Sequence, residues 1–355
     1  LINGRHSMRF LIFGMGAIGT YIGGSLTLSG ESVIYLERSE IARRFDQQPL
    51  ALEIEGKEHT FVPEGVRDAL EKVFDQSSID VVLVAVKSFD TPEVARRLQP
   101  YRDQISAVVS LQNGVENEEI LAEYVGRDRV IAGTLTSAVG KKETGKVVLE
   151  RKRGIGIAKG HVLSESIVES FNRANLNARL YSHAGEMKWS KLLTNLLANA
   201  TSAILDLTPA EIFSDPRLFR IETAQVREAV RIMKRLGYRV VDLPGTPVRL
   251  LSVLFHNIPE GIARRLAGKT LATGRGGKMP SFHVDLYRGY RPLEVDYLNG
   301  AVVRFGERLG VSTPVNAFLN ETLLSIAERP IEDNIYRKNP ERLIADISKR
   351  VRLFS

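Results

Sequence analysis

One lysine and two asparagines recur at a four-residue spacing in residues 187–199. Lys191, Asn195 and Asn199 stand at i, i+4 and i+8, so they would share one face of a helix. Leucines occupy much of the remaining helix surface, so the polar stripe faces either solvent or a cleft. In a cleft, a lysine removed from water can hold a lowered pKa and deliver a proton, while amides orient the acceptor oxygen. The spacing alone leaves both interpretations open.

A glycine-rich segment with GxGxxG spacing lies near the start of the chain. It reads Gly14-Met15-Gly16-Ala17-Ile18-Gly19, directly after a β-rich run at 9–13 and at the start of a helical pattern at 17–28. In this context the first glycine permits a tight turn, the second admits a pyrophosphate, and the third allows close packing of helix and strand. The phosphates would meet N–H groups at the positive helix end. We expect these residues to bind a dinucleotide; a structural glycine turn is the alternative.

Glu37 and Arg38 follow a second expected strand at 32–36. An acidic residue at this place usually holds the 2′-hydroxyl of the adenosine ribose, whereas an arginine favours a 2′-phosphate. Because of Arg38 we expect NADP as cofactor, and NAD stays open because of Glu37. A surface ion pair without influence on cofactor choice is the other interpretation.

The first half of the chain alternates β-rich and helical runs, which is typical of a parallel sheet wrapped by helices. Two short, continuously apolar runs, 81–86 and 105–111, are expected as buried central strands. A hairpin is expected around Gly56 and Lys57, and a second one with the loop 140–145. Further strands are expected at 130–135, 146–151 and 154–158.

After about Ser182 the apolar period becomes helical. Helices are expected at 187–205, 216–236, 247–266, 292–309 and 316–327. The predicted fold class is therefore α/β, with an N-terminal Rossmann-type parallel sheet domain at 8–182 and an all-α C-terminal domain at 183–355. Residues 1–7 carry no fold pattern, and we expect them to be a leader or a remnant.

Composition excludes several classes of site. The chain has no cysteine, so thiolate metal sites and a cysteine nucleophile are excluded, and no metal is expected. No apolar run is long enough to cross a membrane, and a cytoplasmic protein is expected. Residues 1–150 hold 17 Lys and Arg against 22 Asp and Glu, whereas residues 151–355 hold 32 against 20. The basic excess is dispersed, so solvated helix faces are favoured over an anion-attracting surface, and nucleic acid is not expected as a partner.

Several motifs together resemble the ketopantoate reductase family. Besides the glycine-rich segment and the Lys191 helix, they are Ala85-Val86-Lys87-Ser88, Leu111-Gln112-Asn113-Gly114, Leu293-Glu294-Val295-Asp296-Tyr297-Leu298-Asn299-Gly300 and Thr313-Pro314-Val315-Asn316. Their order and approximate spacing match, and the resemblance runs from Met8 to about Ala327. It implies hydride transfer from NAD(P)H to the keto carbon of a small 2-oxo acid, most simply 2-dehydropantoate in pantothenate biosynthesis.

The resemblance also implies residue roles. Lys191 would be the general acid, and Glu294 would bind the substrate hydroxyl or the ribose. Lys87 would lie near the cofactor, and Ser281 would meet the substrate carboxylate. Asn113, Asn195 and Asn199 would hold the substrate oxygens and the nicotinamide.

Two departures from the family pattern lie where substrate would be recognised. The stretch before Ser281 is longer than expected over 243–280, and one extra residue stands between Asp285 and Glu294. The stretch includes the glycine-rich segment 273–278, in which Arg275 or Lys278 would help to bind an anion, unless the segment is only a connector.

Three alternatives stay open. The first is a paralogue that acts on another 2-oxo acid, and the second is a β-hydroxyacid dehydrogenase with a similar catalytic helix. The third is a dinucleotide-sensing protein without turnover. A homodimer also stays open.

Overall fold

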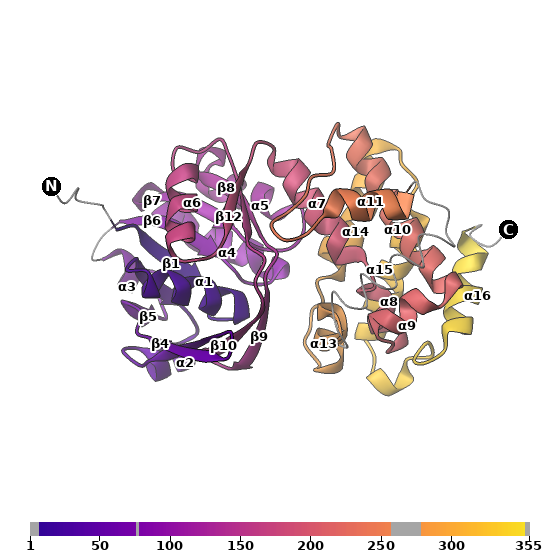
Figure 1. Ribbon diagram of the computed structural model, residues 1–355, viewed down its shortest axis with the longest axis horizontal. Coiled ribbons are helices and arrows are strands. Elements are labelled where there is room, and N and C mark those ends of the chain that lie inside the picture. Colours follow the sequence, from indigo (N-terminus) through magenta and orange to yellow (C-terminus); the bar gives the residue numbers. More distant parts are fainter. Residues whose placement is uncertain (1–6, 76–77, 257–277, 352–355) are drawn as a thin grey trace. The chain divides into compact units, whose positions relative to one another are not determined.

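The computed structural model describes residues 7–75, 78–256 and 278–351 (Figure 1). Its described part forms two compact units. The first comprises the chain up to Lys188 together with the short segment Leu243–Thr246, and the second comprises Trp189–Asp242 and the chain from Pro247 onward. Among the described helices, none combines the length and the apolar character needed to cross a membrane.

An eight-stranded sheet forms the centre of the first unit among the described residues. Its spatial order is β12 (Ala178–Tyr181), β11 (Ile155–Ala158), β8 (Val130–Leu135), β7 (Ile105–Ser110), β6 (Ile79–Val84), β1 (Arg9–Phe13), β2 (Ser32–Leu36) and β5 (Gly65–Arg67). All pairs are parallel except β11 with β8. The prediction of a parallel sheet is thus confirmed, and the runs expected as central strands are β6 and β7.

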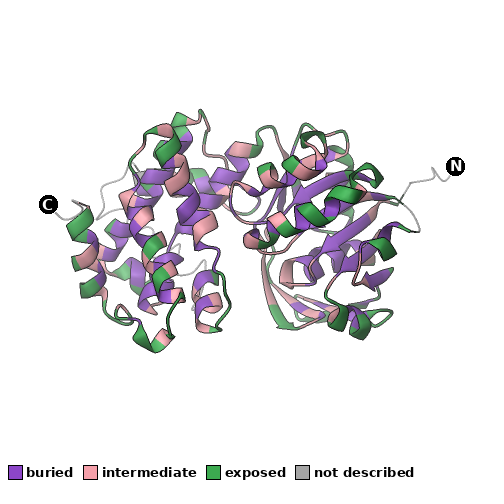
Figure 2. Ribbon diagram, turned by 180° about the vertical axis from the view of Figure 1, so that it is seen from behind, coloured by how far each residue is buried: buried purple, intermediate pink, exposed green. Residues whose placement is uncertain are grey.

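Both faces of this sheet are covered, because successive side chains of a strand point to opposite faces. Phe10 and Ile12 of β1 join one apolar cluster, and Leu11 and Phe13 join another. The first cluster includes residues of α1 (Ala17–Leu28) and α6 (Ser164–Arg173), and the second residues of α3 (Glu71–Phe74), α4 (Thr91–Leu98) and α5 (Asn117–Val125). Figure 2 accordingly shows the strands of this sheet mostly in the colour of buried residues.

A smaller sheet lies in the same unit, in the order β4 (Lys57–Phe61), β3 (Leu50–Ile54), β10 (Lys146–Arg151) and β9 (Ala138–Glu143). The first predicted hairpin is β3–β4, but its turn lies at Glu55 and Gly56, both with positive φ, one residue earlier than expected. The second is β9–β10, in which β9 extends to Glu143, so most of the expected loop is strand. The helix α2 (Ser39–Phe45) follows β2.

The second unit is helical, as the sequence predicts. Among its described residues the helices are α8 (Ala200–Leu205), α9 (Pro209–Ser214), α10 (Pro216–Arg235), α11 (Val248–His256), α13 (Ser281–Tyr287), α14 (Val295–Leu309), α15 (Pro314–Ala327) and α16 (Pro340–Arg350), with a 3₁₀ turn η4 (Ile331–Asp333). The helix α7 (Ala184–Leu196) belongs to the first unit up to Lys188 and to the second from Trp189 onward. The rest of the helix expected at 247–266 lies outside the described residues.

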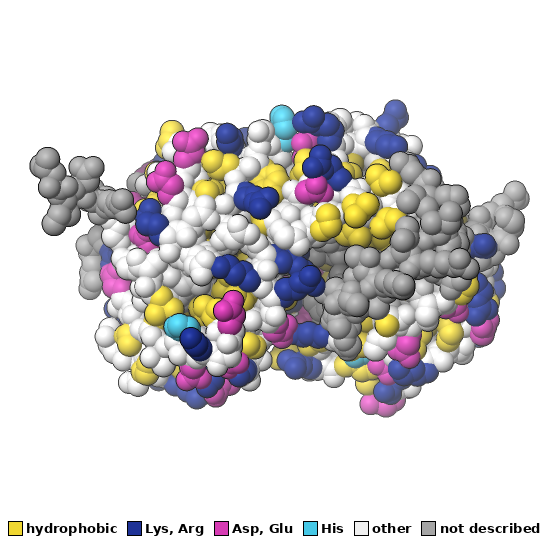
Figure 3. All heavy atoms as spheres, in the orientation of Figure 1, with side chains coloured by type: hydrophobic (Ala, Val, Ile, Leu, Met, Phe, Trp, Pro, Cys, Tyr) yellow, Lys and Arg dark blue, Asp and Glu magenta, His cyan; other side chains and the backbone are white. Residues whose placement is uncertain are grey.

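The basic residues of the second half are dispersed. On the face drawn in Figure 3, Lys and Arg side chains stand in separate small groups between polar and apolar atoms. Many are paired with carboxylates, for example Arg217 with Glu341 at 2.7 Å and Arg342 with Asp346 at 2.9 Å. This distribution agrees with the interpretation of solvated helix faces.

Candidate functional site

The glycine-rich turn joins β1 to α1 as the sequence predicts. Gly14 has φ +92°, a backbone conformation that other residues rarely adopt. A Cβ on Gly19 would lie 2.0 Å from the carbonyl oxygen of Gly14, so only glycine allows the helix to pack so closely on the turn. Gly16 is the N-cap of α1, and a Cβ there would meet no protein atom within 4 Å. The space beside Gly16 is therefore open.

This turn fits the pyrophosphate of a dinucleotide. No side chain caps the N-terminus of α1, and no acidic residue stands in its first turn. A helix of 12 residues that begins in this way presents N–H groups and a positive dipole end to an anion. The open space beside Gly16 is the place that a phosphate approaching the backbone would need.

Glu37 and Arg38 have different environments at the end of β2. The Glu37 carboxylate accepts hydrogen bonds from the backbone N–H of Met15 at 2.5 Å and of Arg38 at 3.1 Å. Arg38 is exposed, and no ion pair of its guanidinium occurs within the described parts of the chain. The pair Glu37–Arg38 is thus not a surface ion pair, because the carboxylate is directed to backbone groups.

Lys87 and Asn113 follow β6 and β7, the strands next to β1. Their loops are tied together by buried polar side chains. The Gln112 amide donates to the carbonyl of Lys87 at 3.2 Å, and the Ser88 hydroxyl and the Asn117 amide donate to the carbonyl of Asn113 at 2.8 and 2.6 Å. Since carboxyl ends of parallel strands share one edge of a sheet, the glycine turn, Lys87 and Asn113 lie along the same edge.

Lys188 is a buried lysine beside the candidate site that the sequence analysis did not single out. Only 4% of the residue is exposed, and its Nζ lies 2.7 Å from Glu118 Oε1 on α5. Its ammonium also donates to the carbonyls of Gln112 at 2.8 Å and Gly133 at 3.3 Å. A buried charge is tolerated only when it is paired and hydrogen-bonded in this way. Lys188 thus ties the first turns of α7 to the loop that carries Asn113. In the sequence, only its position between the apolar Met187 and Trp189 indicated that Lys188 is buried.

The predicted polar stripe is only partly a single helix. Lys191 and Asn195 lie on α7, both half-buried, among buried leucines. The continuous helix expected at 187–205 is wrong, because α7 ends at Leu196 and α8 begins at Ala200. Between them Ala198 has φ +50°, and Asn199 is the buried N-cap of α8. Asn199 therefore does not continue the face of Lys191 and Asn195 by helical spacing.

The structure brings Asn199 and Ser281 together although 81 residues separate them in the sequence. Asn199 Nδ2 donates to Ser281 Oγ at 3.4 Å, and Asn199 Oδ1 accepts from the Phe282 N–H at 3.1 Å. This N–H belongs to the first turn of α13, so Asn199 holds the beginning of that helix. Ser281 itself is exposed.

Glu294 immediately precedes α14 and is only 3% exposed. The helix begins at Val295, later than the expected start at Pro292. On its second turn Asn299 donates to Gln225 of α10 at 3.1 Å, which fixes α14 against α10.

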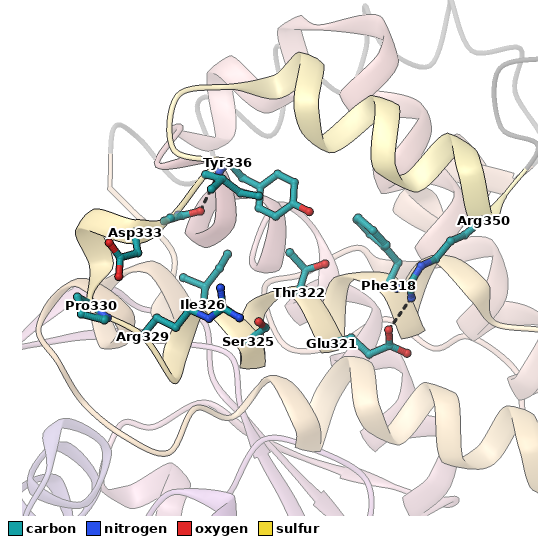
Figure 4. Close-up of a pocket in the computed structure, with 12 residues that line it drawn as sticks. Phe318, Glu321, Thr322, Ser325, Ile326, Arg329, Pro330, Asp333, Tyr336 and Arg350 are labelled. Atoms are coloured by element: carbon teal, nitrogen blue, oxygen red, sulfur yellow. Dashed lines mark hydrogen bonds and ion pairs between the residues drawn. The ribbon is translucent and has the colours of Figure 1, made fainter.

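Of the glycine-rich segment 273–278, only Lys278 belongs to the described residues, and it is exposed. Arg275 lies outside them. Among the described residues, no group of three or more His, Cys, Asp or Glu side chains could hold a metal ion. A surface pocket of about 350 Å³ in the second unit is lined by α15, η4 and α16, and none of the expected site residues lines it (Figure 4).

Comparisons with known proteins cover most of the chain. The family model described as Ketopantoate reductase PanE/ApbA matches residues 10–160, and the model of its C-terminal part matches residues 184–327. The 2-dehydropantoate 2-reductase of Archaeoglobus fulgidus is 30% identical over 92% of this chain and 99% of its own. That of Pyrococcus horikoshii is 28% identical over 88% and 95%.

Solved structures show the same fold. The PanE/ApbA family ketopantoate reductase from Ralstonia eutropha JMP134 has a TM-score of 0.76 at 25% identity, covering 90% of this chain and 99% of its own. A D-mandelate dehydrogenase with NADH and anilino(oxo)acetate has a TM-score of 0.73 at 21% identity, covering 90% and 98%.

The parallel sheet with its glycine turn and the helical unit that follows it define an α/β fold of Rossmann type, and the family match supports an oxidoreductase. The chain belongs to the ketopantoate reductase family.

Proposed function

We propose that this protein reduces a 2-oxo acid with NAD(P)H, and that the acid is 2-dehydropantoate, which becomes pantoate. The observation that carries the proposal is the combination of family motifs over both units with a glycine turn that is open beside Gly16. The names of the archaeal relatives support the choice of substrate. The proposal places the enzyme in pantothenate biosynthesis, in the cytoplasm.

The nicotinamide, when bound, supplies the hydride to the keto carbon. The turn Gly14–Gly19 and the first N–H groups of α1 bind the pyrophosphate, and Lys87 and Asn113 lie on the same sheet edge to contact the rest of the dinucleotide. Lys191 Nζ gives a proton to the oxygen that becomes the new hydroxyl. The half-burial of Lys191 on a leucine-rich helix supports this role, because part of the side chain stays accessible.

Four further residues bind the acid in this proposal. Asn195 lies one turn beyond Lys191 on α7 and would orient the reacting oxygen. Asn199 and Ser281, which are hydrogen-bonded to each other, would meet the carboxylate. Glu294 would accept a hydrogen bond from a substrate hydroxyl or the ribose.

We further propose that NADPH is preferred over NADH. Arg38 is exposed at the end of β2 and is not engaged in an ion pair within the described chain, so it is available to a 2′-phosphate. Glu37 is directed to the N–H groups of Met15 and Arg38. A longer stretch before Ser281 favours a second candidate, a paralogue with another 2-oxo acid as substrate.

The decisive experiment follows the loss of reduced-nicotinamide absorbance with NADPH or NADH and a panel of 2-oxo acids that includes 2-dehydropantoate. Lys191→Ala should lower kcat roughly 100- to 10,000-fold, as loss of a positioned general acid does, with the dissociation constant of NADPH unchanged. Lys191→Arg is the matched control, because it keeps the charge but holds its proton too firmly to donate it. Near-normal kcat in Lys191→Ala would remove Lys191 from the mechanism.

Two further results of the same assay bear on the proposal. Arg38→Ala should raise the KM for NADPH by roughly tenfold or more, since hydrogen bonds to charged groups contribute about 1.5–3 kcal/mol, and leave that for NADH unchanged. Preference for another acid over 2-dehydropantoate would favour the paralogue, and no turnover with any acid would contradict the enzyme itself.

A further inference from the structure

Glu222 is a carboxylate with no exposed surface in α10. It accepts hydrogen bonds from the backbone N–H of Ala198 at 2.6 Å, from Thr201 Oγ1 at 2.7 Å and from Gln225 Nε2 at 2.7 Å. Two of these donors lie in or next to the break between α7 and α8. None of the roles proposed above uses Glu222.

The break needs such a partner. Ala198 has φ +50°, which L-residues other than Gly, Asn and Asp seldom adopt, and its N–H is fully buried with the rest of the residue. A buried backbone N–H must find an acceptor, and bonds to a carboxylate are stronger than those to a neutral oxygen. Glu222 supplies this acceptor, so its carboxylate makes the interruption of the helix favourable.

The residue after the break is Asn199, whose side chain holds Ser281 and the N–H of Phe282. The contacts therefore connect α10 through the break to α13. Glu222 binds the N–H of Ala198, Ala198 precedes Asn199 in the sequence, and Asn199 binds Ser281. Each contact lies within the second unit. A shift of the break would move Asn199 and release the start of α13.

We propose that Glu222 is a positioning residue for substrate binding: it holds the break between α7 and α8 so that Asn199 and Ser281 present a fixed pair of polar groups to the carboxylate of the acid. This inference rests on the proposed function, because that function assigns Asn199 and Ser281 to the substrate.

Glu228 offers a matched control on the same helix. It is 2% exposed and accepts hydrogen bonds from the N–H groups of Val315 and Asn316 at 2.9 Å each and from Asn316 Nδ2 at 2.7 Å. These bonds fix α15 and not the break. Loss of either carboxylate should therefore lower stability, but only loss of Glu222 should affect the substrate.

The experiment compares Glu222→Ala, Glu222→Gln and Glu228→Ala in the full chain. Glu222→Ala should raise the KM for the 2-oxo acid roughly 10- to 100-fold, the range expected from loss of a charge-assisted hydrogen bond, with the NADPH dissociation constant unchanged. Glu222→Gln should restore the KM, because its oxygen can accept from Ala198 and Gln225 while its NH₂ donates to Thr201. Glu228→Ala should lower the unfolding temperature and leave the KM unchanged.

A second measurement does not depend on turnover. Amide hydrogen exchange at Phe282 should accelerate in Glu222→Ala and not in Glu228→Ala. If Glu222→Ala is recovered unfolded, Thr201→Val removes one donor to the same carboxylate and should produce smaller changes in the same direction. If the wild-type protein reduces no 2-oxo acid, the proposed function is wrong. The exchange data then still decide whether Glu222 positions Asn199 and the start of α13. Unchanged exchange at Phe282 in the folded variant, or an equal rise of KM in Glu228→Ala, would overturn the inference.

Discussion

Gly19→Ala should lower the stability of the fold, whereas Gly16→Ala should leave the fold intact and weaken dinucleotide binding. A methyl group at Gly19 would lie 2.0 Å from the carbonyl oxygen of Gly14 and 3.2 Å from Ile12 Cγ2. Ordinary contacts between such atoms begin at about 3.5 Å. The first neighbour is backbone and cannot rotate away, so helix α1 or the turn must move.

The cost follows from two opposing terms. Overpacking costs about 1–3 kcal/mol, and alanine in a helix regains about 0.5–1 kcal/mol over glycine. Gly19→Ala should therefore be destabilised by roughly 1–2 kcal/mol, which lowers the unfolding temperature by roughly 2–8 °C for a unit of this size.

Gly16→Ala should leave the fold intact. Gly16 has φ −73° and ψ −172°, which any residue adopts, and its Cβ would meet no protein atom. Alanine is a poorer N-cap than glycine, but the lower entropy of the unfolded chain offsets much of that loss, so stability should change by at most about 1 kcal/mol. The methyl group would nevertheless occupy the space that a pyrophosphate needs. We expect the NADPH dissociation constant to rise roughly tenfold or more, which corresponds to about 1.4 kcal/mol.

Thermal unfolding by circular dichroism and titration with NADPH separate the two effects, and each variant is the control of the other. If Gly16→Ala binds NADPH like the wild type, the pyrophosphate does not lie on this turn. If Gly19→Ala unfolds at the wild-type temperature, the close approach of helix and turn is not rigid.

Two other perturbations test the packing around the site and the C-terminal helix. Lys188→Met should lower the free energy of unfolding by about 3–5 kcal/mol, since it leaves Glu118 without its buried partner. Denaturant unfolding of Lys188→Met, Glu118→Gln and the double variant measures the coupling between the two residues. If the losses of stability in the two single variants simply add in the double variant, the two residues are not coupled. The pKa of Asp346 is lowered to about 2, above all by the hydrogen bond from Lys349. A folded-state pKa below the unfolded value gives stability that is complete above about pH 4 and is lost as the pH falls toward that pKa. The difference in unfolding temperature between wild type and Asp346→Asn should therefore shrink over this range; a constant difference would speak against the ion pair.

Much of the first unit was predictable because its signals are local. The glycine pattern of residues 14–19 lies within one strand–turn–helix unit, and each glycine has a steric reason that neighbouring residues impose. The strand β8 has the bounds that were expected for it from the sequence, Val130–Leu135. The helical position of Lys191 and Asn195 likewise follows from spacing within one helix.

Other features depend on partners far away in the sequence. The strand β3 pairs in parallel with β10, from which almost a hundred residues separate it, so local patterns predicted the two hairpins but not that they join in one sheet. The burial of Lys188 required Glu118 and two carbonyl groups of other elements.

The interruption of the Lys191 helix shows most directly how local sequence signals differ from contacts with distant residues. By its sequence the segment 187–205 is helical, because its leucines and alanines favour a helix throughout. Only tertiary structure brings the buried carboxylate of Glu222 to the N–H of Ala198 and so gives the chain an alternative to the next helical hydrogen bond. The sequence by itself determined which residue types the site contains. The tertiary structure decided that Asn199 leaves the helix face of Lys191 and joins Ser281, because acceptors for buried N–H groups can come from anywhere in the fold.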